Sequence, residues 1–303
     1  MSLNQQIHFS NSRNIQIWIK REDLLHPEVS GNKYRKLKDN LAFAKAKNHS
    51  SILTFGGAYS NHIAATAAAG TMEGLQTIAI IRGEELGMNL AETLTQNPTL
   101  AFAASYGMEL HFVSRAEYRE KDEAHFRESI KEKFDNPYIV PEGGTNSLAI
   151  KGCEEILTED DEKFDFVCCA VGTGGTVAGL INSATASQNV LAFPALKGAW
   201  IQEEIEKWTE KKDWKIISDY HFGGYARINK ELVSFINNFK QEYDILLDPV
   251  YTGKMMFGIF EMVDKGYFPE NSRILAVHTG GLQGVAGMNI KLQKKGLPLI
   301  QVS

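Results

Sequence analysis

Ser30-Gly31-Asn32-Lys33-Tyr34-Arg35-Lys36-Leu37 is a turn that leads into a helix and carries a lysine at the helix start. Its first three residues are typical of turns and helix caps, and apolar side chains then recur at helical spacing. A helix is therefore expected from about residue 33 to about residue 47. Most lysines in proteins are solvated and have no specific role, but this turn predicts a fixed, inward-facing position for Lys33.

The composition is that of a globular protein. The chain has 303 residues, of which 43% are hydrophobic and 23% charged, enough for one large domain or two smaller ones. The net charge is −5, and no basic run with interleaved aromatic residues occurs. Nucleic acid and anionic membranes are therefore not expected as partners.

No targeting segment is expected. Residues 1–12 are polar and lack the apolar region of a signal peptide, and no apolar stretch is long enough to cross a bilayer. The protein is therefore expected to be cytoplasmic. Its three cysteines, Cys153, Cys168 and Cys169, form neither a disulfide framework nor a Cys-x-x-Cys pair, and we interpret them as core residues.

Short apolar runs alternate with helical patterns along most of the chain, which is typical of parallel sheets covered by helices on both faces. Strands are expected at 15–19, 51–55, 75–81, 109–113, 138–140, 164–171, 190–193 and 274–277. Helices are expected at 63–70, 89–106 with a break near Pro98, 116–133, 200–208, 230–240 and 256–265. A further helix is expected to run through residue 157, and another to begin at about residue 177. Residues 248–254 are expected to form a loop, and residues 211–227 give no clear pattern.

Glycine-rich loops follow several of these strands, at 56–62, 143–147, 172–176 and 278–281. In open α/β sheets, ligands bind at the carboxyl ends of the strands, where these loops lie. The sequence therefore predicts a ligand site at this edge.

The loop Gly172-Thr173-Gly174-Gly175-Thr176 could hold a phosphate, because it offers backbone N–H groups and hydroxyls at the start of a helix. It could equally be a tight turn that needs glycine for its backbone angles. A P-loop would need a lysine that this loop lacks. A dinucleotide fingerprint would need a glycine at Val177 and an acidic residue near 193–195, so NAD and ATP are not expected.

A phosphate cup without nucleotide features, together with a lysine placed by a glycine turn, suggests pyridoxal phosphate. The chain resembles the 1-aminocyclopropane-1-carboxylate deaminase and D-cysteine desulfhydrase family, which are pyridoxal-phosphate enzymes of the tryptophan-synthase β type. The resemblance lies in the segments 30–33, 56–62, 142–147, 172–176, 248–251 and 278–281, in the order of that family. It implies two open, twisted, mostly parallel sheets flanked by helices, the architecture called fold type II.

The resemblance also implies roles for individual residues. Lys33 would form the Schiff base with the cofactor, and Gly172, Thr173, Gly174, Gly175 and Thr176 would hold its phosphate. Asn61 would hydrogen-bond the cofactor's phenolic oxygen, and Thr279 would face its pyridine nitrogen. Ser60 and Asn61 would hold the substrate carboxylate, with His62 beside them, although Ser60 could also be a simple helix cap.

The remaining candidates concern acid and base chemistry. Tyr251 would act as an acid or base near the substrate, and Ser60 could join it in catalysis. His62 and His278 have no partners at metal-ligand spacing, so no metal site is expected and both histidines are assigned structural or hydrogen-bonding roles.

The resemblance implies an enzyme, a lyase, deaminase or hydrolase that acts on a small amino acid. Lys33 would take the Cα proton, and loss of a β leaving group would yield a 2-keto acid and ammonia, as in a D-cysteine desulfhydrase. Family deaminases usually carry a second tyrosine in the strand that here reads Ile274-Leu275-Ala276-Val277, so cyclopropane ring opening is less expected. Two alternatives stay open, a 1-aminocyclopropane-1-carboxylate deaminase that forms 2-oxobutanoate and a non-catalytic pyridoxal-phosphate-binding protein.

The expected organisation is a large cofactor domain built from residues 1–50 and 141–303, with a smaller, mobile domain at 51–140. The resemblance further implies closure of the smaller domain over bound substrate and assembly as a homodimer.

Overall fold

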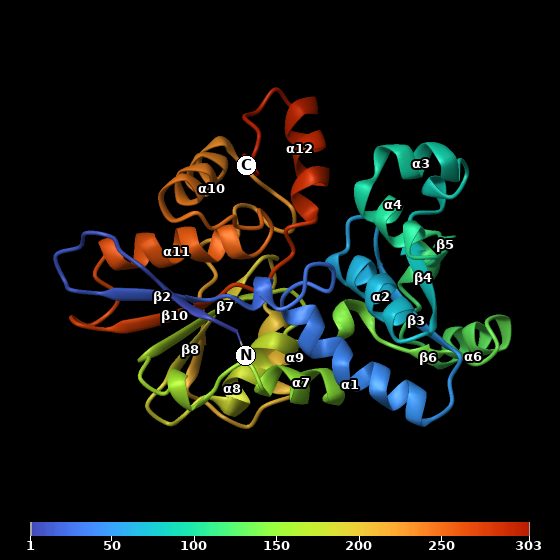
Figure 1. Ribbon diagram of the computed structural model, residues 1–303, viewed down its shortest axis with the longest axis horizontal. Helices are drawn as coiled ribbons and strands as arrows, with labels where there is room; N and C mark the ends of the chain where they lie inside the picture. Colours follow the sequence, from blue (N-terminus) through green and yellow to red (C-terminus); the bar gives the residue numbers. More distant parts are fainter. Residues whose placement is uncertain (1, 303) are drawn as a thin grey trace.

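Two β-sheets flanked by helices form the framework of the protein (Figure 1). The computed structural model describes residues 2–302. The larger sheet has six strands in the order β1-β2-β10-β7-β8-β9, and only β1 runs antiparallel to its neighbour. Its strands are β1 Asn4–Ile7, β2 Gln16–Lys20, β7 Phe166–Val171, β8 Asn189–Pro194, β9 Trp214–Ile216 and β10 Arg273–Val277.

The smaller sheet has four strands in the order β5-β4-β3-β6, all parallel. They are β3 Ser51–Gly57, β4 Gln76–Arg82, β5 Glu109–Val113 and β6 Tyr138–Ile139. All four therefore come from the segment that the sequence assigned to a smaller domain. The two mostly parallel sheets confirm the predicted fold class.

Helices follow most of the strands, as the alternating pattern predicted. They are α1 Asn32–Ala46, α2 Asn61–Met72, α3 Leu90–Gln96, α4 Pro98–Ser105, α5 Arg115–Tyr118, α6 Ala124–Lys133, α7 Ser147–Glu154, α8 Gly175–Ser183, α9 Trp200–Glu206, α10 Lys230–Tyr243, α11 Thr252–Asp264 and α12 Gly284–Lys294. None of the helices in residues 2–302 is long and apolar enough to cross a membrane.

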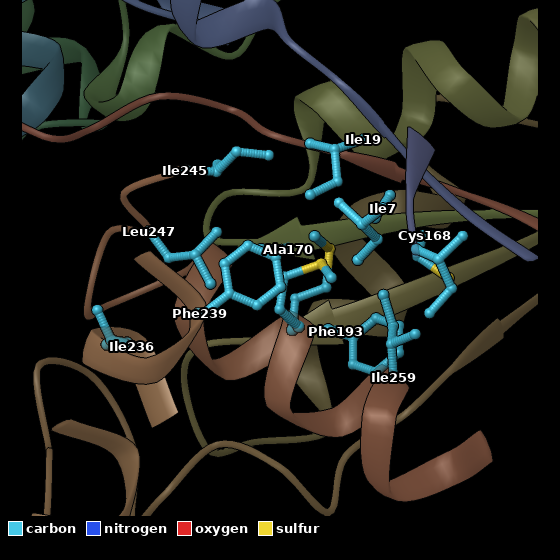
Figure 2. Close-up of a cluster of buried hydrophobic side chains, with 14 of the residues drawn as sticks. Ile7, Ile19, Cys168, Ala170, Phe193, Ile236, Phe239, Ile245, Leu247 and Ile259 are labelled. Atoms are coloured by element: carbon cyan, nitrogen blue, oxygen red, sulfur yellow. The ribbon is translucent and has the colours of Figure 1, made fainter. Parts of the chain in front are cut away.

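The main core lies between the six-stranded sheet and the helices α10 and α11 (Figure 2). Side chains from strands and helices meet there, among them Ile19, Cys168, Phe193, Phe239 and Ile259. Complete burial of one such aliphatic or aromatic side chain stabilises the fold by about 1.5–3 kcal/mol. All three cysteines are free and buried, which confirms their assignment to the core.

The alanine-rich helix α2 packs closely on the smaller sheet. A Cβ atom on Gly70 would lie 2.2 Å from Cγ2 of Thr77 on β4, so only glycine fits at this crossing. Small side chains along α2 thus let the helix lie flat against the strands, and its first turn reaches the carboxyl edge of β3.

Several predicted elements were wrong or missing. The polar N-terminal stretch contains β1, and only its residue Met1 lies outside the described part of the chain. The expected helix at 116–133 is split into α5 and α6, and α11 begins inside the expected loop at 248–254. Helix α12, which follows the last strand, was not predicted at all.

Candidate active site

A cavity of about 1010 Å³ lies where the carboxyl ends of both sheets face each other. Its wall is formed by the loops after β3, β6, β7 and β10, together with the start of α1 and one face of α12. The glycine loops predicted from sequence therefore meet at one site.

The turn before α1 is fixed by the loop after β10. Gly31 has a φ angle of 63°, and a Cβ atom on it would lie 2.0 Å from the carbonyl oxygen of Thr279. The backbone N–H of Asn32 donates to that oxygen at 3.3 Å, and its Nδ2 donates to Oγ1 of Thr176 at 2.7 Å. The turn therefore needs glycine, and it ties the start of α1 to both the 279 loop and α8.

Lys33 extends from this fixed helix start into the cavity. Its Nζ donates to Oδ1 of Asn32 at 3.2 Å. Burial, with a smaller contribution from the neighbouring charge of Lys36, lowers the pKa of the Lys33 amine to about 7. Near neutral pH, a large fraction of this amine is therefore uncharged and able to act as a nucleophile or base.

Lys36 is a second buried lysine on the same face of α1, three residues after Lys33. Its Nζ donates to the carbonyl oxygen of Gly143 at 3.0 Å and to Oγ1 of Thr145 at 3.1 Å. Among the described residues, no carboxylate forms an ion pair with it, and burial lowers its pKa. A Cβ atom on Gly175 would lie 3.1 Å from this Nζ, so the ammonium lies directly beside the glycine loop.

The loop at 172–176 begins helix α8. Gly174 caps the helix in the left-handed conformation, with φ of 83°, and the chain turns helical at Gly175. Oγ1 of Thr173 lies 2.7 Å from Oγ1 of Thr145, which joins this loop to the loop after β6. The first backbone N–H groups of α8 have no partners within their own helix, so the loop is suited to bind an anion.

Ser60 and Asn61 begin helix α2 on the opposite side of the cavity. Oγ of Ser60 accepts a hydrogen bond from the backbone N–H of Ile63 at 3.4 Å, so Ser60 is a helix cap. Oδ1 of Asn61 accepts from Gln283, which leaves the Asn61 Nδ2 group near Gly281. The capping role and a role in holding a carboxylate are compatible, since both use the positive end of α2.

His62 lines the same cavity, but its ring is buried and points toward β3. Its Nε2 lies 2.8 Å from Oγ1 of Thr54, which donates to the carbonyl oxygen of Val140 at 3.0 Å. Because Thr54 has a single proton, Nε2 of His62 carries the proton of this contact, and Nδ1 is left as an acceptor with no hydrogen-bond partner among the described residues. Burial and the nearby charges of Lys33 and Lys36 hold the pKa of His62 well below its usual value, so its ring is neutral.

Tyr251 lies between the glycine loop and a second tyrosine. A Cβ atom on Gly172 would lie 3.2 Å from the Tyr251 hydroxyl oxygen, and the Tyr225 and Tyr251 rings meet edge to face with centroids 6.3 Å apart. Burial raises the pKa of both phenols. Asp248 accepts hydrogen bonds from the backbone N–H groups of Val250, Tyr251 and Thr252, which fixes the start of α11.

Thr279 closes the cavity on the side of the six-stranded sheet, where its side chain is only 8% exposed. The preceding residue, His278, is part of the framework. Its Nε2 donates to the carbonyl oxygen of Leu246 at 2.8 Å, and its Nδ1 accepts from the backbone N–H of Gly280 at 3.2 Å.

The structure brings nearly all of the predicted site residues to one cavity. Those that line it are Lys33, Ser60, Asn61, His62, Gly172, Thr173, Gly174, Thr176, Tyr251 and Thr279. Gly175 is the exception; it is the first residue of α8 and lies close to Thr145 and Lys36.

Sequence reasoning missed Lys36 and Tyr225. Lys36 carried a usable signal, since a residue three positions after Lys33 lies on the same helix face. Tyr225 carried none, because it lies in an irregular segment whose path depends on contacts with α11 and α12.

The residues fit pyridoxal phosphate. The amine of Lys36 lines the cavity beside the α8 N-terminus, where the two together could bind an anion, and the Lys33 amine lies in the same cavity. Among the described residues, no group of three histidine, cysteine or acidic side chains could hold a metal ion.

Comparison with known proteins gives the same class. A sequence profile described as "Pyridoxal-phosphate dependent enzyme" matches residues 4–280. The chain therefore belongs to this family of pyridoxal-phosphate-dependent enzymes. The predicted cofactor and the enzymatic nature of the protein are thereby confirmed.

Within this class, the chain is similar to deaminases and desulfhydrases. It is 32% identical over 301 residues to a putative 1-aminocyclopropane-1-carboxylate deaminase of Pyrococcus abyssi, with 91% of this chain and 87% of that protein covered. It is 31% identical over 297 residues to a mitochondrial bifunctional D-cysteine desulfhydrase/1-aminocyclopropane-1-carboxylate deaminase of Arabidopsis thaliana, with 89% and 73% covered. A solved structure described as an ACC deaminase homologue aligns with a TM-score of 0.80 at 26% identity, over 97% of this chain and 92% of that chain. The wider expectation of a hydrolase matches none of these names.

Proposed function

We propose that the protein catalyses α,β-elimination from a small D-amino acid with a β leaving group, releasing a 2-keto acid and ammonia as a D-cysteine desulfhydrase does. The observation that carries this proposal is the convergence of three groups on one cavity: the Lys33 amine, the α2 helix start at Ser60 and the Tyr251 phenol. They correspond to a base, a carboxylate site and an acid, which are the groups that an elimination needs.

The phosphate of the cofactor would lie at the glycine loop 172–176. Backbone N–H groups at the start of α8 would donate to it, and Lys36 would neutralise part of its charge. When bound, pyridoxal phosphate supplies an aldehyde that condenses with amines and a ring that withdraws electrons from the neighbouring carbon.

Lys33 would be both the anchor and the base. Its amine reacts with an aldehyde only when uncharged, and its lowered pKa of about 7 favours that form. Once substrate has displaced it, the same nitrogen would take the Cα proton and hold it at Nζ.

The substrate carboxylate would lie at the positive end of α2, against Ser60 and Nδ2 of Asn61. Thr279 would present a hydroxyl to the pyridine nitrogen, and a hydroxyl does not keep that nitrogen protonated as a carboxylate would. This weaker electron withdrawal suits a short elimination. Tyr251 would donate a proton to the leaving group, and its raised pKa keeps the phenol protonated at neutral pH.

We further propose that residues 51–140 move as a smaller domain over bound substrate. Support comes from the sheet topology, because the four strands of this segment form a sheet of their own, separate from the six-stranded sheet. We also propose that the protein is cytoplasmic, because its three cysteines are free. The family resemblance supports assembly as a homodimer. Light scattering on the purified protein measures the assembly directly.

The test is turnover of D-cysteine by purified holoenzyme, with release of sulfide, pyruvate and ammonia measured together. Lys33→Ala should abolish turnover, whereas Lys38→Ala, which removes an exposed lysine of the same helix, should leave it unchanged. A Lys33→Ala variant that still turns over D-cysteine at the normal rate would exclude the proposed mechanism.

A second candidate is deamination of 1-aminocyclopropane-1-carboxylate. Strand β10 lacks the family's second tyrosine, but Tyr225 brings a phenol to Tyr251 from a different element. Ammonia release from the cyclopropane substrate at a rate comparable to that from D-cysteine would favour this candidate. The third alternative, a non-catalytic cofactor-binding protein, has no support among relatives that are named as enzymes.

A further inference from the structure

Helix α12, which the sequence did not predict, runs along the cavity from its substrate end outward (Figure 1). At its start, a Cβ atom on Gly284 would lie 3.4 Å from Oδ1 of Asn61, beside the proposed carboxylate site. Three lysines follow on the same side of the helix, two and three turns further along, and all of them line the cavity. They are the α12 lysines, Lys291, Lys294 and Lys295. The helix therefore joins the substrate site to a cluster of positive charge.

The length of the helix sets the distance between these two ends. Lys291 lies seven residues and Lys295 eleven residues after Gly284, which corresponds to about 10 and about 16 Å along the helix axis. An extended chain spans about 1.2 Å per bond, so the three bonds from the carboxyl carbon of cysteine to its sulfur span only about 4 Å. A substrate of the size of cysteine, held at Asn61, therefore ends well short of the α12 lysines.

The wall of the cavity between the two ends is apolar. Met288 and Ile290 line it. The Tyr59 ring lines it as well, 2.7 Å from the position that a Cβ atom on Gly287 would take. The whole cavity, at about 1010 Å³, lies at the upper end of the range of about 300–1,000 Å³ for small-molecule sites. It therefore has room for a hydrocarbon chain beside the cofactor and the amino-acid group.

The α12 lysines have no acidic neighbour. Helix α12 contains no aspartate or glutamate, and no carboxylate within residues 2–302 forms an ion pair with any of the three lysines. Nζ of Lys291 is held at the cavity wall, where it donates to the carbonyl oxygen of Ala226 at 2.7 Å. Burial, together with the like charges of Lys295 and Arg227, lowers the pKa of Lys291. A bound anion would offset this repulsion between like charges.

We propose that the α12 lysines bind a carboxylate at the end of the substrate's β substituent, while Ser60 and Asn61 hold its α-carboxylate. The inference rests on the proposed elimination and names its substrate class. That class is D-cysteine thioethers whose second carboxyl group lies about eight bonds from the first, since about eight bonds are needed to span about 10 Å.

The reaction of such a thioether is balanced. The Cα proton passes to Nζ of Lys33, and the electron pair of that bond forms the Cα–Cβ double bond. The Cβ–S bond breaks with its electron pair on sulfur, which takes the phenolic proton of Tyr251, and the proton held on Lys33 then restores the phenol. One water molecule hydrolyses the released enamine. The thioether and water thus give an acidic thiol, pyruvate and ammonium, with no oxidant or reductant.

The test uses a ligand that cannot be eliminated. D-2-Aminononanedioate has carbon in place of sulfur and carries its two carboxylates eight bonds apart, and its ω-amide differs only in lacking the distal charge. Binding of each to the holoenzyme is measured by calorimetry. Wild type should bind the dicarboxylate about tenfold more tightly than the amide, because charge-assisted hydrogen bonds to lysine are stronger than neutral ones.

The double variant Lys294→Gln/Lys295→Gln should reduce this preference to less than about threefold. The double variant Lys45→Gln/Lys265→Gln is the matched control, because it changes the net charge equally at two exposed lysines that do not line the cavity. It should keep the full preference. Equal affinity of wild type for the two ligands, a preference that survives in the first variant, or a preference lost equally in the control would overturn the inference.

Turnover separates the inference from the function on which it rests. S-(4-Carboxybutyl)-D-cysteine should be eliminated with a kcat/KM about tenfold above that of its ω-amide, with release of 5-sulfanylpentanoate and pyruvate. Equal kcat/KM values for the acid and the amide would overturn the assigned substrate class. A wild-type protein that binds the dicarboxylate selectively, yet eliminates neither D-cysteine nor the thioethers, would refute the proposed function and still support the carboxylate site.

Discussion

Replacement of Lys36 by methionine tests the assignment of the phosphate site. The ammonium of Lys36 is buried, has no carboxylate partner in residues 2–302, and lies 3.1 Å from the position of a Cβ atom on Gly175. Loss of a buried, charge-assisted contact with a phosphate costs about 2–4 kcal/mol. At 1.4 kcal/mol for each factor of ten, this weakens binding roughly 30- to 1,000-fold.

The assay is calorimetric titration with pyridoxamine 5′-phosphate, which cannot form a Schiff base with Lys33, and with pyridoxamine, which lacks the phosphate. Lys36→Met should weaken binding of the phosphorylated ligand by that factor and leave binding of the other ligand within about threefold. Lys38→Met is the matched control, because Lys38 lies on the same helix in an exposed ion pair with Glu155.

The same variant should leave the stability of the cofactor-free protein within about 1 kcal/mol of wild type. Removal of a buried ammonium relieves its desolvation, and this gain offsets the lost hydrogen bonds to Gly143 and Thr145. Because the pKa of Lys36 is lowered in the folded protein, wild type should gain stability relative to the variant as the pH rises toward about 10.4. Equal losses of affinity for both ligands would refute the placement of the phosphate.

Three further predictions follow from the turn, the amine and a buried ion pair. Because the Lys33 amine has a pKa of about 7, the rate at which cofactor-free protein reacts with pyridoxal phosphate should rise about tenfold per pH unit below pH 7 and level off above it. A rate measured by stopped flow that keeps rising to pH 10 would contradict this prediction. Gly31→Ala should destabilise the fold by more than about 3 kcal/mol in urea unfolding, because its Cβ would lie 2.0 Å from the Thr279 carbonyl oxygen. The control, Gly74→Ala, has a φ of 72° but open space around it, and should cost only about 1–2 kcal/mol. Asp161→Asn should lower the free energy of unfolding by about 3–5 kcal/mol, because it removes the carboxylate oxygen that lies 2.6 Å from Nζ of the buried Lys20. The control, Glu261→Gln, breaks an exposed ion pair and should change the free energy of unfolding by less than about 1 kcal/mol. Burial raises the pKa of Asp161, but hydrogen bonds from Lys20, Asn4 and Thr158 lower it by more, so the net pKa lies below its ordinary value. The stability that the ion pair contributes should therefore be present above about pH 4 and lost as the pH falls through the folded pKa.

The central strands of the sheets were predictable because they are buried on both faces. Strands such as β3 and β4 read as continuous apolar runs, and such runs between turns leave few alternatives. Strand β1 lacks this signal. It is an antiparallel edge strand, and only Ile7 of its four residues is buried.

Glycine misled the prediction at α12. Glycines at 284 and 287 are unfavourable in helices, so this stretch did not read as one. In the structure, a Cβ atom on Gly287 would lie 2.7 Å from the Tyr59 ring, so the small residue makes room for a side chain from the loop after β3. That requirement depends on tertiary contact and cannot be read from local sequence.

The site was predictable where a local motif fixes the geometry. Gly31 and Gly174 define turns that place Lys33 and the start of α8, and both turns lie where the motifs indicated. Tyr225 depends instead on long-range contacts from Lys254 and Lys291. Its position therefore became apparent only in three dimensions.

The most direct test of the central claim is an absorbance spectrum of purified protein before and after D-cysteine, followed by borohydride reduction and peptide mapping. The account predicts a visible band that D-cysteine alters, and a pyridoxyl group on Lys33 after reduction. Absence of the band after addition of pyridoxal phosphate, or a label on another lysine, would contradict it.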